Sequence, residues 1–364
     1  MGKRPLPSRA RWSHRLVVAL TAALAAVAST MVGGVGMAGA HSGEPPGTPT
    51  TLADGLVGPL HLDASGRDIL VSQSFAGKIS RIHDGVVTDL VSEPDAFTGG
   101  VANGPFGTVL FLISGQSGSF LKMRLPNGTV RSIADLGAYE AKNNPDQVNT
   151  YGMEGLTPEC AQQLPPDIPF LPYSGEVDSN PYELAVTPLG TFVADAGGND
   201  ILFVTWSGRI STVSVLPPRP YTITAETVAA MGLPNCVSGL TYNFEPVPTD
   251  VVIGPRLQLY VSSLPGGPED ASFGARGSVF RINPLTGRSK VIGDGFLGAT
   301  NLAVAPNGTV YVAEMFGGRI SKLTGNGPVT VAQVTDPAAV QWSCGRLYAT
   351  TDVNGSGKVV RFRA

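Results

Sequence analysis

One sequence frame recurs along the chain and constrains its fold more than any other feature. Each copy has an apolar strand, a turn of Pro or Ser with Gly, a second apolar strand, a Gly-rich loop and a third strand that mixes basic and apolar residues. The cleanest copy is NLAVAPNGTVYVAEMFGGRISKL at residues 301–323. A short turn and a fourth apolar strand follow every copy except the last. The remaining copies, which bring the total to six, occupy residues 61–82, 101–123, 183–204, 250–282 and 340–362.

Four-stranded units that repeat about every 40–50 residues are the signature of a β-propeller. The six units average about 43 residues once two non-repeating inserts, 141–179 and 218–246, are set aside. Their first two strands are apolar at odd and even positions alike, as strands buried on both faces are. We therefore predict an all-β fold, a six-bladed β-propeller of four-stranded antiparallel blades, in one domain at residues 41–364. TTLADGL at 50–56 supplies the missing fourth strand of the last blade and closes the ring.

The first forty residues have the pattern of an export signal. They carry five basic residues and no acidic one, an apolar run at 16–28 and the small-residue motif Ala38-Gly39-Ala40. We expect a general secretory signal peptide at residues 1–40, cleaved after Ala40, and hence a secreted, extracytoplasmic protein. An uncleaved membrane anchor is the alternative, and only then would a membrane be a partner.

The four-stranded blade decides which loops share a face of the propeller. Turns after strands one and three lie on one side and are all short, so we name this side the short-turn face. Loops after strand two and the connections between blades lie on the other side, which we name the loop-rich face. It holds both inserts and the long loop SLPGGPEDASFGARG. Variable loops usually carry function, so the loop-rich face is the expected binding surface.

Each insert contains the signal for a short helix. Thr157 is the expected N-cap ahead of PECAQQL, and Thr224 is the expected N-cap ahead of AETVAAM. Proline-rich stretches lie beside both helices. Two interpretations stay open: loops that pack over the channel, or a lid or partner surface around Phe170, Tyr173 and Tyr221.

The three cysteines suggest one disulfide. Cys160 lies in the first insert and Cys236 in the second, and both inserts join neighbouring blades on the loop-rich face. An exported chain meets an oxidising compartment, so we predict a Cys160–Cys236 disulfide; three free thiols are the alternative. Cys344, at the first turn of the last blade, is then unpaired, and we expect it to be buried and inert.

Polar residues begin the inner strands of three successive blades: Glu183, Asp250 and Asn301. The repeat places them at one level around the channel mouth. Two carboxylates and an amide are oxygen ligands suited to Ca²⁺ or Mg²⁺, the cofactors that this set would hold. Six-bladed lactonases of the regucalcin and gluconolactonase type hold a metal with a similar set. The alternative is that these groups cap strand ends in a water-filled channel. Four further residues complete the expected ligand-binding set: Asp195, Asn199, Asp200 and Glu314.

The histidines argue against several propeller chemistries. Only His61 lies in an inner strand, where a buried core histidine is the commoner interpretation, and no histidine follows His83. Propeller lyases and paraoxonase-like esterases depend on a histidine base near the channel. We therefore assign no catalytic residue.

Several segments resemble one family. NPYELAVTPLGTFVADAGGNDILFV with LPPRP, VPTDVVIGP, LYVSSLPGG, GSVFRINPLTG and NLAVAPNGTVYVAE are similar to the ScyD/ScyE family, most strongly over residues 180–323. Its members are exported propeller proteins related to ones encoded beside scytonemin biosynthesis, within the NHL-like six-bladed class. The resemblance implies export and fold, and it brings no catalytic residues with it.

The leading function is a non-catalytic exported propeller, expected to be monomeric, that binds a small molecule or a protein on its loop-rich face. Without the first forty residues, 20 basic residues stand against 28 acidic ones, a net charge near −8 that argues against nucleic acid as a partner. The alternative is a metal-dependent hydrolase of lactonase type that uses Glu183, Asp250 and Asn301. A structural cell-surface module without a ligand is the third interpretation.

Overall fold

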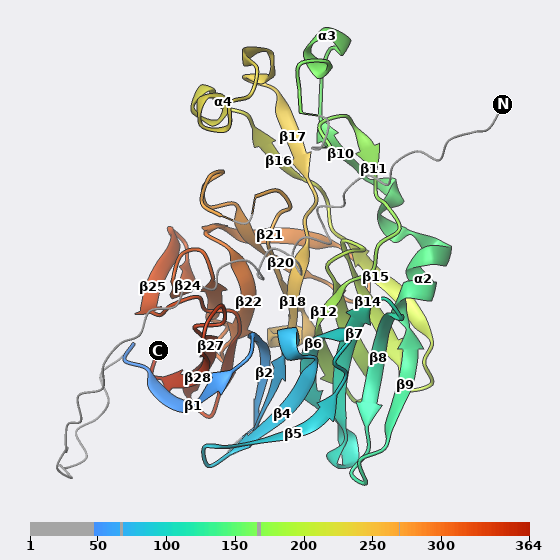
Figure 1. Ribbon diagram of the computed structural model, residues 1–364, viewed down its shortest axis with the longest axis vertical. Coiled ribbons are helices and arrows are strands. Elements are labelled where there is room, and N and C mark those ends of the chain that lie inside the picture. The colour runs from blue at the N-terminus through green and yellow to red at the C-terminus, as the bar shows by residue number, and fades with distance from the viewer. Residues whose placement is uncertain (1–46, 66–67, 166–168, 269) are drawn as a thin grey trace.

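The computed structural model describes residues 47–65, 68–165, 169–268 and 270–364. Most of this part of the chain forms four-stranded antiparallel sheets, seven in number (Figure 1). The first three sheets in chain order are β2 (Pro59–Ser65) to β5 (Val86–Ser92), β6 (Ala96–Asn103) to β9 (Val130–Asp135), and β12 (Pro181–Thr187) to β15 (Ile210–Val215). Their middle strands are β3 (Asp68–Gln73), β4 (Lys78–His83), β7 (Val109–Gly115), β8 (Gly118–Arg124), β13 (Gly190–Asp195) and β14 (Asp200–Thr205).

The next three sheets repeat this order. They are β18 (Pro248–Ile253), β19 (Leu259–Ser263), β20 (Gly277–Ile282) and β21 (Ser289–Phe296); then β22 (Ala299–Val304), β23 (Val310–Glu314), β24 (Arg319–Thr324) and β25 (Gly327–Gln333). The last contains β26 (Val340–Ser343), β27 (Arg346–Thr351), β28 (Gly357–Phe362) and β1 (Thr50–Leu56). We number these six sheets one to six in chain order.

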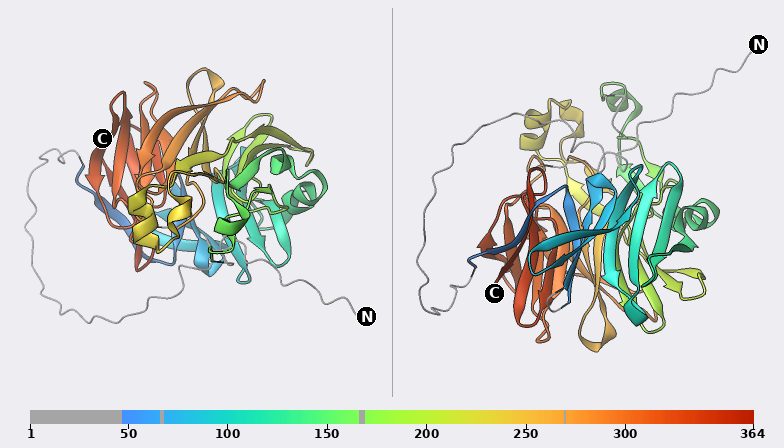
Figure 2. Two further views of the ribbon diagram at one scale, coloured as in Figure 1. Left: turned by 90° about the horizontal axis from the view of Figure 1, so that it is seen from above. Right: turned by 60° about the horizontal axis from the view of Figure 1, so that its bottom comes forward.

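The predicted strand order is confirmed within each sheet. Second strands end at the residues that the repeat aligns, among them Asp195 and Glu314. β1 pairs antiparallel with β28, so residues Thr50–Leu56 do supply the fourth strand of sheet six. The first strand of each sheet contacts the first strand of the next, and β2 also contacts β26. Figure 2 shows the sheets arranged side by side around an axis.

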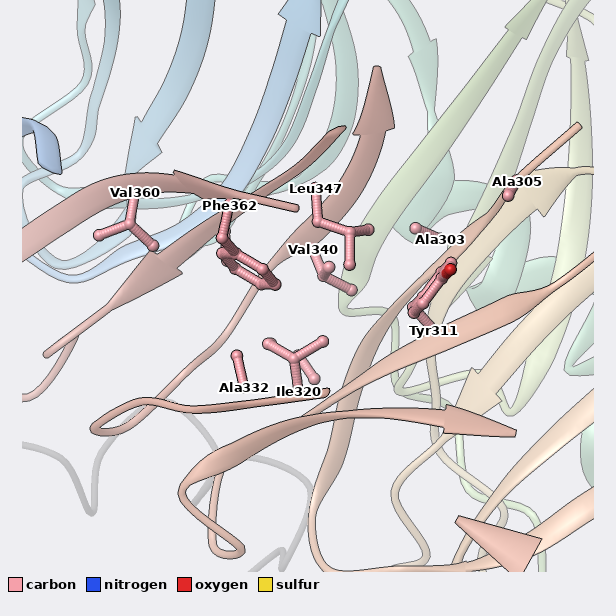
Figure 3. Close-up of a cluster of buried hydrophobic side chains, with 11 residues drawn as sticks. Ala303, Ala305, Tyr311, Ile320, Ala332, Val340, Leu347, Val360 and Phe362 are labelled. Carbon is pink, nitrogen blue, oxygen red and sulfur yellow. The ribbon is translucent and has the colours of Figure 1, made fainter. Parts of the chain in front are cut away.

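The core lies between neighbouring sheets. β7 has no polar–apolar alternation from Val109 to Ile113, and each of these five residues is at most 2% exposed. Figure 3 shows one such layer, in which Ile320 of sheet five faces Leu347 and Phe362 of sheet six. A strand that is covered on both faces needs apolar residues at both its odd and its even positions, and the sequence shows this pattern.

The two inserts form the seventh sheet together. Its order is β11 (Tyr173–Ser174), β10 (Thr150–Met153), β17 (Thr241–Phe244) and β16 (Arg219–Thr222), so each insert contributes two of its strands. A Cys160–Cys236 disulfide joins the inserts, as predicted. Helices α3 (Pro158–Ala161) and α4 (Ala225–Met231) begin at the expected caps, Thr157 and Thr224. In Figure 1 this insert sheet projects above the six other sheets.

Two details differ from the prediction. Helix α2 (Leu136–Asn143) begins before the expected insert boundary, with Asp135 accepting a capping hydrogen bond from the Ala138 N–H. Cys344 is exposed, so the prediction of a buried thiol is wrong. It occupies a tight turn between β26 and β27 with φ of 48°, and its neighbour Ser343 is only half-buried.

The predicted export signal lies outside the described residues. Within the described ranges, no helix has the length and apolarity that a membrane crossing requires. The disulfide indicates that the protein folds in an oxidising compartment.

Candidate functional site

A cavity of about 400 Å³ lies among the innermost strands. Residues from β2, β6, β12, β18, β22 and β26 all contribute to its wall, so it lies between the first strands of the six sheets. Its apolar wall consists of Val, Leu, Ile and Ala side chains. Its polar wall contains carboxylates, amides and a hydroxyl, from Asp63, Ser65, Asn103, Glu183, Asp250, Asn301 and Gln341.

The structure brings together the three polar residues predicted for the channel. Glu183, Asp250 and Asn301 each lie in the first strand of their sheet, are at most 6% exposed and line this cavity. Their oxygens already accept hydrogen bonds from the backbone. Asp250 Oδ2 accepts from the Leu302 N–H at 2.8 Å and Asn301 Oδ1 from the Val340 N–H at 2.8 Å, each in the next sheet. These two side chains therefore tie neighbouring inner strands together.

Glu183 makes a longer connection. Its Oε1 accepts from the Leu184 N–H at 2.9 Å, and its Oε2 lies 2.9 Å from His61 Nδ1 on sheet one. Sheet two stands between these sheets, and Gly100 in β6 leaves the passage open, because a Cβ on that glycine would collide with Glu183 Oε1. His61 was not among the predicted site residues, although the repeat frame places it at the same level as Glu183.

Burial sets the protonation of this pair. It lowers the pKa of His61 to about 3 and, with a smaller contribution from the Asp63 charge, raises the pKa of Glu183 to about 8. Burial, followed by the Glu183 charge, also raises the pKa of Asp250 well above its ordinary value. At neutral pH His61 is uncharged, and the carboxyl proton of Glu183 is available for the hydrogen bond to Nδ1.

An apolar plug closes one end of the channel. It contains residues at the start of the inner strands, or just before them, together with Val353: Leu60, Phe97, Tyr182, Val247, Ala338 and Val353. Tyr182 packs edge-on against His61 with ring centroids 4.6 Å apart. Along each inner strand the plug precedes the cavity, and Ser65 and Asn103 end β2 and β6 beside the short turns. The cavity therefore opens toward the short-turn face.

The other predicted ligand-binding residues lie elsewhere. Asp195, Asn199 and Asp200 surround the β13–β14 turn and are buried beneath the first insert, where Asn199 Nδ2 donates to Asp146 Oδ2 at 2.9 Å. Glu314 is fully buried and forms a two-pronged ion pair with Arg319, with distances of 2.8 and 2.9 Å. The seven residues thus fall into three separate groups. Throughout the described ranges, no three His, Cys, Asp or Glu side chains are arranged to hold a metal ion.

We predict a pH signature for the channel carboxyl. The raised pKa of Glu183 means that the stability it contributes is present below about pH 4.5 and is lost as pH rises through about 8. Glu183→Gln should reduce the loss of unfolding free energy between pH 5 and pH 8.5 by on the order of 2 kcal/mol. Urea unfolding of both proteins at the two pH values measures this, with exposed Asp54→Asn as the control. Equal pH slopes for wild type and Glu183→Gln would contradict it.

Comparisons with known proteins support the β-propeller fold, but they do not indicate which reaction or ligand belongs to this chain. No family model and no curated protein matches the sequence, so the ScyD/ScyE resemblance stays a prediction. The PQQ-bound aldose sugar dehydrogenase of Streptomyces coelicolor is similar in structure: 15% identity, 88% of this chain and 99% of that chain covered, TM-score 0.52. A proposed glucose dehydrogenase-type oxidoreductase of Thermus thermophilus is also similar, with 16% identity, 86% of this chain and 99% of that chain covered, and a TM-score of 0.52. A proposed gluconolactonase is similar too, with 14% identity, 86% of this chain and 91% of that chain covered, and a TM-score of 0.51. Such neighbours are β-propeller proteins, and at these identities the likeness shows that this chain shares the β-propeller fold and nothing more.

Proposed function

We propose that the protein is an exported six-bladed β-propeller, closed by β1, that binds a small polar molecule in its channel without catalysing a reaction. The observation that carries this proposal is the cavity of about 400 Å³ walled by the first strands of all six sheets. Its volume falls within the range of small-molecule sites, which also combine apolar side chains with placed polar groups. The binding site is then the channel, entered from the short-turn face, because the apolar plug closes its loop-rich end.

The wall indicates the chemistry of the ligand. Carboxylate, amide and hydroxyl groups face the cavity, whereas no Lys, Arg or His side chain of the described residues lines it. Acceptors therefore outnumber donors, which favours a ligand that is rich in hydroxyl or ammonium donors over an anion. Asp63 at the mouth already accepts from Asn103 Nδ2 at 2.8 Å and from Gln341 Nε2 at 3.1 Å, so this rim is held in place before a ligand arrives.

A channel-filling substitution tests the proposal. Ala185 in β12 lines the cavity, and Ala185→Trp should occupy the ligand's space. We expect at least a tenfold loss of affinity for any sugar, polyol or amine that raises the melting temperature of the wild type, which corresponds to about 1.4 kcal/mol. Isothermal titration measures it, and Leu285→Trp, on a distant turn where Leu285 is 94% exposed, is the control. If Ala185→Trp binds such a ligand as tightly as the wild type, the ligand does not occupy the channel.

The second candidate is a metal-dependent hydrolase of lactonase type. What favours it is that Glu183, Asp250 and Asn301 line a single cavity. What weakens it is that each of them already accepts a backbone N–H bond, which a metal would have to share. Lactone hydrolysis that depends on added Ca²⁺ or Mg²⁺ and falls at least 100-fold in Asp250→Asn would establish the hydrolase. Absence of turnover across a lactone and ester panel, with binding retained, leaves the binding protein.

A further inference from the structure

Four carboxyl groups are buried together where the first insert meets sheet three. Glu140 comes from α2 and Asp146 from the 3₁₀ turn Pro145–Val148, whereas Asp195 and Asp200 flank the β13–β14 turn. All four are at most 2% exposed. We name this set the acidic junction. It lies outside the channel, since none of the four lines the cavity.

Two members of the acidic junction are held in place by hydrogen bonds. Asp195 Oδ1 accepts from the N–H groups of Asn180 and Gly198, and its Oδ2 accepts from Ser179 Oγ at 2.7 Å. Asp146 Oδ2 accepts from Tyr151 and Asn199, and its Oδ1 packs over Gly175. These bonds fix the positions of both carboxyls.

Three oxygens of the acidic junction have no hydrogen-bond partner: Asp146 Oδ1, Glu140 Oε1 and Asp200 Oδ1. Glu140 Oε1 and Asp200 Oδ1 are buried and accept no hydrogen bond. The two side chains approach one point beside Gly198. The position that a Cβ on that glycine would occupy lies 3.2 Å from Glu140 Oε2, 3.5 Å from Asp200 Oδ1 and 3.6 Å from Asp195 Cγ. Glycine at 198 therefore leaves a space onto which three carboxyl groups face.

Basic side chains do not neutralise this charge. Among the ion pairs of the described residues, no Lys, Arg or His is paired with any of the four carboxyls. Burial, together with the charges of Asp195, Asp146 and Asp178, raises the pKa of Glu140 to about 8. Burial, then the Asp195 and Glu140 charges, raises the pKa of Asp200 well above its usual range. Buried carboxylates are compensated by protons or by a cation.

We propose that Glu140 and Asp200 bind one Ca²⁺ ion beside Gly198 and so fasten α2 of the first insert to sheet three. Two carboxylates supply the charge, and water completes the oxygen shell. This composition agrees with the lack of a ready-made set of three acidic ligands among the described residues. Ca²⁺ suits the site better than Mg²⁺, because Ca²⁺ accepts irregular oxygen shells whereas Mg²⁺ demands a near-octahedral shell and retains its waters.

Thermal unfolding of the whole protein at pH 8 tests this, with EDTA-treated protein titrated with Ca²⁺ or with Mg²⁺. We expect about 1 mM Ca²⁺ to raise the melting temperature by roughly 2–6 °C, with a smaller effect of Mg²⁺. At pH 5 the response should shrink, because protons occupy the carboxyls. Glu140→Gln and Asp200→Asn should each abolish the response at pH 8. In EDTA at pH 8 each should melt at or above the wild-type temperature, because each removes one of the repelling charges.

Two control variants separate this site from the rest of the molecule. Exposed Asp54→Asn should keep the full Ca²⁺ response, and so should Asp250→Asn, which alters only the channel. Equilibrium dialysis should find one Ca²⁺ per chain in wild type and none in Asp200→Asn. The proposal would be overturned if Ca²⁺ did not change the melting temperature of the wild type, while Glu140→Gln made the melting temperature less dependent on pH. Protons, and not a cation, would then neutralise the buried carboxyls of the acidic junction. A response lost in Asp250→Asn and kept in Asp200→Asn would also overturn it and place the ion in the channel.

Discussion

A chain that starts at Val57, and so lacks β1, is expected to lose more stability than a typical core substitution removes. β1 covers the outer edge of β28, and its Leu56 and Ala53 are 2% and 8% exposed. Removing it uncovers these contacts and leaves the backbone groups of β28 facing water. The expected loss is on the order of 5 kcal/mol in the free energy of unfolding. Urea denaturation monitored by circular dichroism measures it.

The control for this truncation is a chain that starts at Gly47 and retains the strand. Leu56→Ala should show part of the effect, about 2–4 kcal/mol, because it deletes the most buried side chain of β1. A chain without β1 that unfolds at the same urea concentration as the control would mean that sheet six is complete without its N-terminal strand. The proposed closure of the ring would then be wrong.

The second large effect concerns the disulfide. The Cys160Ser/Cys236Ser double variant should destabilise the insert sheet by on the order of 4 kcal/mol, because the link closes a loop with a sequence separation of 76 residues. The loss should be local, since β10 and β17 pair over only two residue positions. Limited proteolysis should cut the variant within the inserts at least tenfold faster than the wild type, while the six other sheets keep their cooperative unfolding.

Cys344→Ser is the matched control, since that cysteine is exposed and unpaired. It should resist proteolysis as the wild type does. If the double variant is cut no faster than this control, apolar packing around Phe170 and Phe244 holds the insert sheet together without the covalent link.

Strand boundaries were predictable because turns mark them. The Pro-Asn-Gly and Pro-Leu-Gly turns set the length of each hairpin, so the ends of β13 and β23 at Asp195 and Glu314 followed from counting. The disulfide between the inserts followed from their shared face and from the two cysteines, whereas the sheet that the inserts form together was not predicted. Helix α2 was missed because it continues directly from β9, with Asp135 serving both as the last strand residue and as the N-cap.

For the channel residues, the sequence predicted only their position along the inner strands and not the contacts of their side chains. The repeat frame placed Glu183, Asp250 and Asn301 at one level, and all three line the cavity. Side chains from different sheets meet in the channel, and their volumes decide which end is closed. The positions of the turns in the repeat do not reveal how these side chains pack. The Glu183–His61 contact needs a missing Cβ at Gly100 in a third strand. The frame also gave no reason to expect Glu140 beside Asp200, because α2 lies outside the repeat.

The shared insert sheet has a mechanical consequence. One insert leaves from the end of β9 and the other from the end of β15, so their strands and their disulfide arch over sheet three and tether its flanks to each other. While the disulfide is intact, we expect the two inserts and sheet three to move as one rigid unit. Sheet six is held by backbone pairing between β1 and β28 instead, so in the proposed ring we expect heating to separate these two strands first.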